Sequence, residues 1–212
     1  FLIIVLALTS FAFAVLIKIS FLDFCSRLVY HEFSWCSTIE KNKLKAGNCL
    51  KSLFITEKPS VAREFAAALQ INAKNRDGYL EGEKAVITWC VGHLVTMSYP
   101  DQYDPALKKW DLETIPFIPE KFKYEVIPAV KKQFDIVSSL LNREDVDTIY
   151  VCTDSGREGE YIYRLVDQEA KVSAKKKKKR VWIDSQTKEG VIRGGKEAKG
   201  LEENDNLASV AY

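Results

Sequence analysis

The sequence predicts an α/β fold with a four-stranded, mostly parallel sheet flanked by helices. From residue 52 onward, short apolar runs typical of buried strands alternate with segments of helical period. Strands that alternate with helices form βαβ units, and such units build a mostly parallel sheet. The chain has 212 residues, of which 47% are hydrophobic, and this is enough to bury the core of one domain or slightly more.

The first half of the alternation begins with residues 52–56 (SLFIT), an apolar run typical of a buried strand. A helix is expected over 61–70, where apolar residues recur at i, i+4 and i+8, and Pro59 suits its first turn. A hairpin turn is expected around Gly82. Residues 85–91 (AVITWCV) are then predicted to form the second strand.

The second half follows residues 98–128, which hold five of the six Pro and are expected to be a long irregular excursion. Two further strands are predicted over 148–153 and 180–184. Helices are predicted over 130–141, 159–170 and 187–198.

Composition excludes several classes of protein. A net charge of +2 gives no global reason to expect a nucleic-acid partner. Ten Gly and six Pro exclude collagen-like and low-complexity chains, and five Cys exclude a dense disulfide scaffold. The basic stretch Lys175–Arg180 is expected to be a solvated loop before the last strand, with a phosphate-binding patch as the alternative.

The first 49 residues do not share the alternating pattern. Residues 1–17 carry no charge and the apolar run continues after Lys18 to Leu22, close to the length of a membrane span. We favour the interpretation that residues 1–49 are not a domain but in-frame sequence upstream of a start at Leu50. A membrane anchor and a signal peptide remain alternatives.

The position of a ligand site follows from the predicted fold. In a parallel sheet the site lies at the carboxyl ends of the strands. The sequence therefore predicts a site built from four short segments: residues 56–58, 92–93, 154–160 and 184–185.

Residues 154–160 (DSGREGE) hold three carboxylates directly after a predicted buried strand. Carboxylates this close repel one another unless a cation neutralises them. Oxygen ligands beside basic groups suit Mg²⁺ with a phosphate, and Glu57 at the end of the neighbouring strand would complete such a site. The alternative is a solvated acidic loop that caps the following helix, since acids favour helix N-termini.

Five ordered motifs within residues 50–212 resemble one family: LFITEKPSVAREFAAAL, VGHL, KKWDLETIPFIPEKFKYEVI, TDSGREGEYI and KRVWIDSQT. Together they are similar to the N-terminal Toprim (Rossmann-like) domain of type IA DNA topoisomerases, in particular the bacterial topoisomerase III branch. Residues 1–49 match nothing in this family, which also favours Leu50 as the start. The resemblance implies a Toprim domain over 50–198 and the beginning of a following helical domain over 199–212.

The resemblance implies breakage, passage and resealing of a DNA strand, with Mg²⁺ held near the scissile phosphate. Glu57 and Lys58 would be catalytic, Glu57 as metal ligand or proton donor to the leaving 3′ hydroxyl and Lys58 as the cation beside the phosphate. Asp154 and Glu158 would be metal ligands together with Glu57. Many family members have a second Asp where this chain has Gly156, which leaves a second metal ion open.

Three residues are assigned to DNA. The resemblance places His93 against DNA, although a lone His after a strand is otherwise a structural residue. Trp110, in a basic stretch, is expected to stack on an unpaired base, with packing of the excursion onto the core as the alternative. Arg157 has two open interpretations, a phosphate contact and a salt bridge that balances the acids.

Single-stranded DNA is therefore the expected partner, in the cytoplasm, with no small-molecule cofactor, no membrane partner and an open oligomeric state. The family's nucleophilic tyrosine lies in a later domain and Tyr161, Tyr163 and Tyr212 match no nucleophile motif, so the chain alone is expected to be inactive. Two other functions stay open. One is a stand-alone primase-like or nuclease-like Toprim protein, and the other is a membrane-tethered binding module that rests on residues 1–22.

Overall fold

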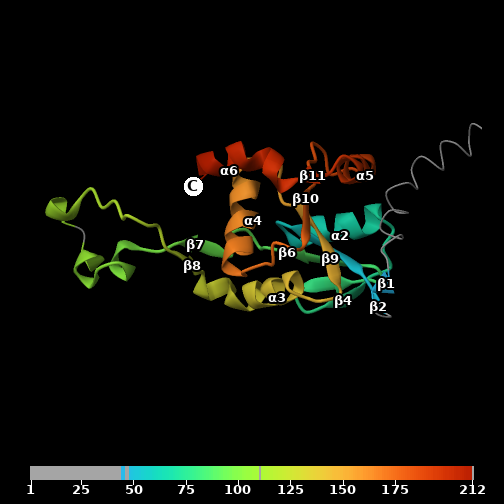
Figure 1. The fold of residues 1–212 in the computed structure, drawn as a ribbon, viewed down its shortest axis with the longest axis horizontal. Helices are drawn as coiled ribbons and strands as arrows, with labels where there is room; N and C mark the ends of the chain where they lie inside the picture. Colours follow the sequence, from blue (N-terminus) through green and yellow to red (C-terminus); the bar gives the residue numbers. More distant parts are fainter. Residues whose placement is uncertain (1–43, 46–47, 110, 212) are drawn as a thin grey trace, which may run out of the picture. The chain divides into compact units, whose positions relative to one another are not determined.

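The computed structural model describes residues 44–45, 48–109 and 111–211 (Figure 1). Within them the main sheet has seven strands in the order β11-β10-β9-β3-β6-β5-β4. Four consecutive strands are parallel, as predicted: β10 (Lys177–Arg180), β9 (Val146–Cys152), β3 (Lys51–Thr56) and β6 (Ala85–Trp89). The prediction missed three short antiparallel strands that extend both edges: β11 (Lys199–Gly200), β5 (Tyr79–Glu81) and β4 (Lys74–Arg76).

Helices cover both faces of the sheet, and each lies within two residues of its predicted bounds: α2 (Pro59–Ala68), α3 (Lys131–Leu141), α4 (Arg157–Glu169) and α5 (Lys188–Lys196). α2 contacts β3, β6 and α5, so α2 and α5 share one face. On the other face, Phe134 of α3 and Ile162 of α4 pack in one buried cluster with Leu53 of β3. Because successive strand residues point to opposite faces, Phe54 lies in the α2 layer, where it stacks on Tyr150.

The last parallel strand does not lie where the sequence analysis placed it. Both the strand over 180–184 and the solvated loop over Lys175–Arg180 are wrong, because Lys177–Arg180 is itself the strand that pairs with β9. The strand ends because Ile183 bonds to a side chain instead of a neighbouring strand. Its N–H donates to Ser155 Oγ, and its carbonyl oxygen accepts from the same hydroxyl, both at 2.8 Å.

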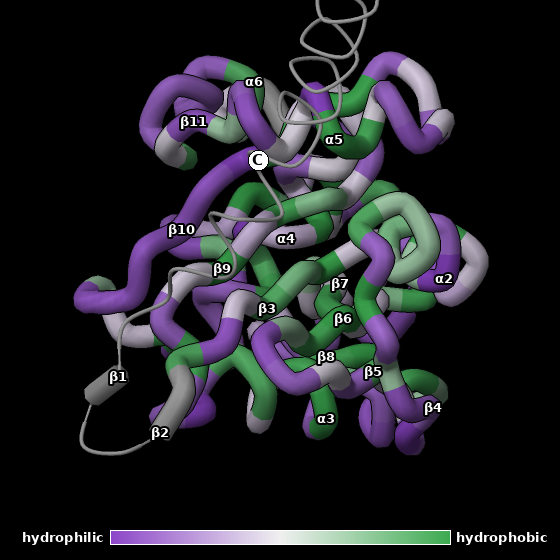
Figure 2. Tube along the Cα trace, turned by 90° about the vertical axis from the view of Figure 1, so that its right-hand side faces the viewer, coloured by the Kyte–Doolittle hydropathy of each residue, from purple (hydrophilic) through white to green (hydrophobic). Residues whose placement is uncertain are grey.

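Two basic side chains of this segment form polar contacts with neighbouring residues. Lys178 bonds to Asp167 of α4 at 2.7 Å, and Lys176 donates to the Arg143 carbonyl oxygen at 2.6 Å. Figure 2 shows β10 as hydrophilic, in contrast to the hydrophobic strands β3 and β6. A strand of this composition can form because its ion pairs compensate the charge that a buried position disfavours.

The proline-rich excursion leaves the domain through β7 (Val95–Met97) and β8 (Tyr124–Val126), which pair antiparallel at its base. Between them, the regular structure of the described residues is limited to short 3₁₀ turns, which confirms the irregular excursion. Figure 1 shows this segment running out beyond β7 and β8, away from the main sheet. Trp110, the predicted DNA contact on it, lies outside the described residues.

The two ends of the described chain lie outside the four-stranded parallel core. β1 (Leu44–Lys45) and β2 (Asn48–Cys49) form a separate two-stranded sheet. After β11, a 3₁₀ turn (Leu201–Asn204) leads into α6 (Asp205–Ala211), which contacts α4. In the part of the chain that the structure covers, none of the helices has the length and apolar character needed to cross a membrane. The anchor and signal-peptide alternatives for residues 1–22 lie outside that part.

Removal of residues 1–49 should leave the main sheet intact, because its central strand begins at Lys51, whose N–H bonds to the Asp145 carbonyl oxygen. We expect a chain that begins at Leu50 to unfold within about 2 °C of the full chain in thermal scans followed by circular dichroism. A chain that begins at Glu57 lacks β3 and should not fold. A loss of more than about 5 °C on the first deletion would show that residues 1–49 stabilise the domain.

Candidate functional site

The segments that follow the parallel strands meet at one edge of the sheet. Thr56, the last residue of β3, is in register with Trp89 of β6 and with Cys152 of β9. The three strands therefore end at the same level. Glu57 follows β3 directly and Asp154 lies two residues beyond β9, so the two acids come together although 97 positions separate them in the sequence.

Glu57 and Asp154 form a close carboxylate pair. The Glu57 side chain is 14% exposed. Asp154 lies near enough to act on the Glu57 carboxyl group through its own carboxylate, which raises the pKa of Glu57, and through its backbone, which lowers that pKa. Burial, and after it the negative charge of Asp154, raise the pKa of Glu57 above its ordinary value. Lys58 offsets part of this repulsion from 3.7 Å, but its own side chain is 58% exposed and the ion pair is weak. The pair carries a charge that a proton or a cation would relieve.

Glu158, the third predicted metal ligand, is held by His93. The distance between His93 Nε2 and Glu158 Oε1 is 2.6 Å, and the imidazole packs edge-on against Tyr161. The turn that carries His93 is tied to β3, because the Gly92 N–H donates to the Glu57 carbonyl oxygen at 3.3 Å. Gly92 has a φ of +80°, which favours glycine. His93 is thus placed beside the acids by the end of the neighbouring strand.

The three predicted metal ligands are divided between two pairs. Among the residues with described positions, no three His, Cys, Asp or Glu side chains are close enough together to hold a metal ion. Like-charge repulsion explains this division, because carboxylates without a neutralising cation are more stable with separate partners. The Glu57–Asp154 pair nevertheless fits a hard cation, since it offers oxygen donors from one mostly buried and one exposed carboxylate.

Two glycines shape the acidic loop in different ways. A Cβ on Gly159 would overlap the Asp154 carbonyl oxygen, so the tight entry into α4 requires glycine there. A Cβ on Gly156 would meet no atom within 4 Å, so a side chain would fit where many family members carry a second Asp. Thr153 closes the loop by donating its hydroxyl to the Gly159 carbonyl oxygen at 2.8 Å.

Arg157 begins α4 as an exposed residue and has no ion pair with the part of the chain that the structure describes. The interpretation as a salt bridge that balances the acids therefore gains no support. We retain the phosphate contact. The first turn of α4 also carries free backbone N–H groups, which favour an anion near Arg157.

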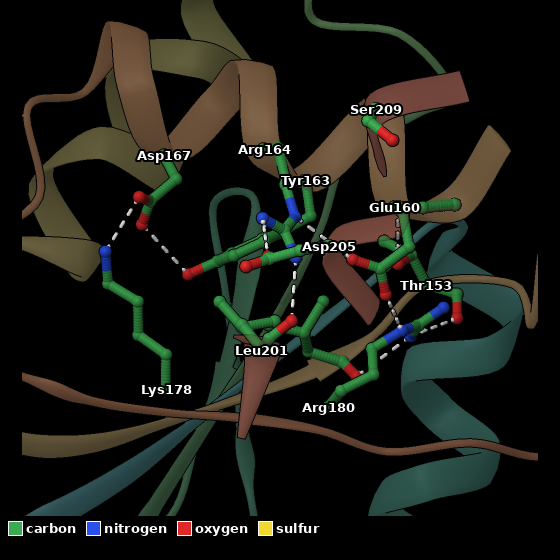
Figure 3. A network of polar contacts seen from close by, with 12 residues as sticks. Thr153, Glu160, Tyr163, Arg164, Asp167, Lys178, Arg180, Leu201, Asp205 and Ser209 are labelled. Atoms are coloured by element: carbon green, nitrogen blue, oxygen red, sulfur yellow. Dashed lines mark hydrogen bonds and ion pairs between the residues drawn. The ribbon is translucent and has the colours of Figure 1, made fainter. Parts of the chain in front are cut away.

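Beneath the loop lies a buried ion pair that the sequence analysis did not anticipate (Figure 3). Arg180 of β10 and Glu160 of α4 are 2% and 0% exposed, with Arg180 Nε 2.5 Å from Glu160 Oε1. Glu160 also pairs with Arg164, whose guanidinium bonds to Asp205 of α6 and to the Leu201 carbonyl oxygen. The one signal in the sequence is that Arg ends a run otherwise made of Lys, and Arg suits buried sites with several acceptors.

A cavity of about 360 Å³ opens beside Asp154, with Phe65 of α2, Trp182 and Gln186 in its wall. Trp182 is 41% exposed, and the Arg180 guanidinium lies 5.4 Å from the centre of its ring. An exposed indole next to a carboxylate site can stack on a nucleobase. The sequence analysis missed Trp182 because it placed this residue inside a predicted strand.

Comparisons with known proteins agree with the motifs. The family model described as Toprim domain matches residues 52–185. DNA topoisomerase 3 of Staphylococcus epidermidis is 45% identical over 162 residues, which are 76% of this chain and 22% of that protein. DNA topoisomerase 3 of Staphylococcus aureus is 48% identical over 157 residues, with 74% and 22% covered. Full-length topoisomerase I of Thermotoga maritima matches in structure over 74% of this chain and 22% of that chain, with 18% identity and a TM-score of 0.47.

Glu57→Gln should stabilise the metal-free domain at neutral pH. The raised pKa means that Glu57 is harder to ionise in the folded state than in the unfolded chain. The free energy of unfolding therefore falls as the pH rises from 4.5, the ordinary pKa, through the raised pKa, and the full loss is reached at higher pH. Glutamine removes the penalty, and we expect a gain of about 0.5–1 kcal/mol, limited by solvent screening.

Urea unfolding with a chelator at pH 7.5 and pH 5 measures this gain, which should shrink at the lower pH. Glu64→Gln is the matched control, since it makes the same charge change at an exposed position of α2. The two variants behaving alike at both pH values would contradict the assignment of strain to the Glu57–Asp154 pair.

Proposed function

The chain belongs to the Toprim domain family, and from this we propose that it is the Mg²⁺-dependent, DNA-binding part of a type IA DNA topoisomerase of the topoisomerase III branch. The observation that carries the proposal is the Glu57–Asp154 carboxylate pair at the carboxyl ends of β3 and β9. The chain spans 22% of the length of the topoisomerase 3 relatives, so strand breakage, passage and resealing are proposed for a whole protein of that kind.

Mg²⁺ would be held by Glu57 and Asp154, with Glu158 of the same loop as the third proposed ligand. When bound, the ion would supply positive charge beside a scissile phosphate. The proposal is supported by the repulsion within the acid pair, which Lys58 offsets only in part, and by the hard oxygen donors that the pair offers.

Two exposed cations are proposed to contact phosphates. Lys58 lies beside Glu57, and Arg157 begins the helix that follows the acidic loop. His93 would contact DNA from the end of β6, and Trp182 would stack on a base in the adjacent cavity. Trp110 keeps its predicted stacking role on the excursion.

The alternative role proposed for Glu57, in place of metal ligation, is to donate a proton to the leaving 3′ oxygen, since a carboxylate that binds Mg²⁺ carries no proton. The raised pKa of Glu57 favours the protonated form more than in an ordinary Glu, because burial and Asp154 both disfavour its charge. Lys58 would stabilise the negative charge that develops on the phosphate. Both groups come from the two residues that follow β3, so one strand end would position the proton donor and the cation together.

The attacking tyrosine is proposed to come from another part of the whole protein. Tyr163 is fully buried, and both burial and the Asp167 carboxylate raise its pKa. Burial also raises the pKa of Tyr161, which packs against His93. A phenol with a raised pKa is a poor nucleophile near neutral pH unless a base activates it. We also propose that the protein acts on DNA in the cytoplasm.

A stand-alone primase-like or nuclease-like Toprim protein is the second candidate. It would share the acid pair, but not the KKWDLETIPFIPEKFKYEVI and KRVWIDSQT motifs that this chain carries. The topoisomerase 3 relatives match about three quarters of this chain at 45% and 48% identity, which favours the first candidate.

Asp154→Asn should weaken the binding of Mn²⁺, used as a spectroscopic substitute for Mg²⁺, by about tenfold or more, because it removes one charge of the acid pair. The domain should stay folded, since the same change relieves repulsion. Titration followed by electron paramagnetic resonance of free Mn²⁺ measures the affinity. Asp184→Asn is the control, since Asp184 lines the same cavity but pairs with Arg193. Equal affinities for both variants would remove the metal proposal.

Arg157→Gln should weaken single-stranded DNA binding and lower the slope of log affinity against log salt by about 0.7, the value for one lost phosphate contact. Lys171→Gln makes the same charge change just beyond the other end of α4 and should leave both values almost unchanged. Fluorescence anisotropy with a labelled oligonucleotide measures them.

The same DNA samples test the absence of a nucleophile. After incubation with Mg²⁺ and denaturation, we expect no covalent adduct between DNA and the chain. An adduct that Tyr161→Phe abolishes would show that the attacking group lies in this chain. Free DNA fragments that Asp154→Asn abolishes would instead favour the nuclease-like candidate.

A further inference from the structure

We propose that Arg180 is a positioning residue. It would hold the acidic loop, residues 154–160, in the conformation that binds a cation, through hydrogen bonds to the loop backbone. This inference deepens the proposed function, because it rests on the proposed Mg²⁺ site at Glu57 and Asp154. Arg180 itself would not touch the ion or the DNA.

The Arg180 guanidinium donates hydrogen bonds to backbone carbonyl oxygens around the start of the loop. Nη1 donates to the carbonyl oxygens of Val151 and Thr153, at 3.0 and 2.7 Å, and to that of Val181 at 3.3 Å. Nη2 donates to the carbonyl oxygen of Asp154 at 2.7 Å. Thr153 and Asp154 lie just beyond the end of β9, whereas the Val151 carbonyl oxygen also accepts from the Val181 N–H at 2.9 Å. The guanidinium thus binds the backbone where the pairing of β9 with β10 stops and the chain turns into the loop.

Arg180 also contacts the other end of the loop. Arg180 Nε pairs with Glu160, six positions after Asp154 and one turn into α4. One side chain therefore joins the first residue of the DSGREGE segment, through its backbone, to the last, through its carboxylate. Both partners are buried, so water does not compete with these bonds.

The buried ion pair between Arg180 and Glu160 is better explained by orientation of the loop than by added stability. A buried ion pair usually stabilises a fold no better than an apolar pair of similar size, whereas loss of one partner alone is strongly destabilising. The geometry of Arg180, with hydrogen bonds to four carbonyl oxygens and an ion pair with one carboxylate, instead restricts the loop to one conformation. That restriction sets where the Asp154 carboxylate stands relative to Glu57.

The sign of the effect separates positioning from simple electrostatics. A positive charge near a cation site repels the cation, so removal of the Arg180 charge by itself should tighten cation binding. Loss of positioning should weaken it, as loss of groups that orient metal ligands does. The two explanations therefore predict opposite changes in affinity.

The test uses the full chain and four proteins: the parent, Arg180→Lys, the double variant Arg180→Met/Glu160→Gln, and Lys178→Met. Lys178→Met is the matched control, because it removes a cation from the same strand that pairs with Asp167 rather than with the loop. Mn²⁺ affinity is measured by electron paramagnetic resonance. Amide hydrogen exchange of residues 153–160 is measured without metal by mass spectrometry, with residues 146–152 as the internal reference.

We expect Arg180→Lys to bind Mn²⁺ about tenfold more weakly and to exchange its loop amides faster, with the reference strand unchanged. The double variant should do the same although it removes the positive charge of Arg180 together with the negative charge of Glu160, and Lys178→Met should do neither. If Arg180→Lys also raises amide exchange in the reference strand, the double variant is the one to compare with the parent, because it leaves no unpaired buried charge.

Parental exchange rates in the loop of a folded Arg180 variant would overturn the inference, whatever the Mn²⁺ affinity. So would tighter Mn²⁺ binding by the double variant. If loop exchange rises as expected but the parent binds no Mn²⁺, the metal proposal fails, while the role of Arg180 in holding the loop stands.

Discussion

The close approach of Glu57 and Asp154 is the constraint on which the rest of the site depends. Two carboxylates this near one another cost the folded state free energy, and the register of β3 against β9 brings the segments that carry them to the same level of the sheet. The surroundings relieve only part of this cost. Lys58 is exposed and 3.7 Å from Glu57, and His93 draws Glu158 away from the pair. The fold thus maintains a local excess of negative charge at the end of the strands.

α4 connects this charge to the interior of the domain. Glu158 and Glu160 stand two positions apart, which turns them about 200° from one another around the helix. Glu158 accordingly has a side chain that is 69% exposed, whereas Glu160 is 0% exposed and meets Arg180 and Arg164. Because Arg164 also bonds to Asp205, the interior side of the same motif reaches α6, the last described helix. One short acidic motif therefore contributes both to the surface site and to the packing that supports it.

Most of the fold could be predicted from the pattern of apolar residues. The strands over 52–56 and 148–153 and the four helices are confirmed almost at their expected bounds, because the strands are continuous apolar runs and the helices are long enough to show a period. The strand at Lys177–Arg180 was mislocated, since four consecutive basic residues show no strand pattern without knowledge of their ion-pair partners. The three added antiparallel strands have two or three residues each, too few for any period.

The sequence by itself determined the α/β class, the order of the parallel strand and helix elements, and the sheet edge at which the acidic residues gather. These follow from local periodicity and from the rule that parallel strands end together. Only the tertiary structure decided which acids meet: Glu57 with Asp154, and Glu158 with His93. It also decided that Arg180 is buried beneath the loop. Such partners are set by strand register and side-chain packing between segments far apart in the chain, and neither leaves a periodic signal in the sequence.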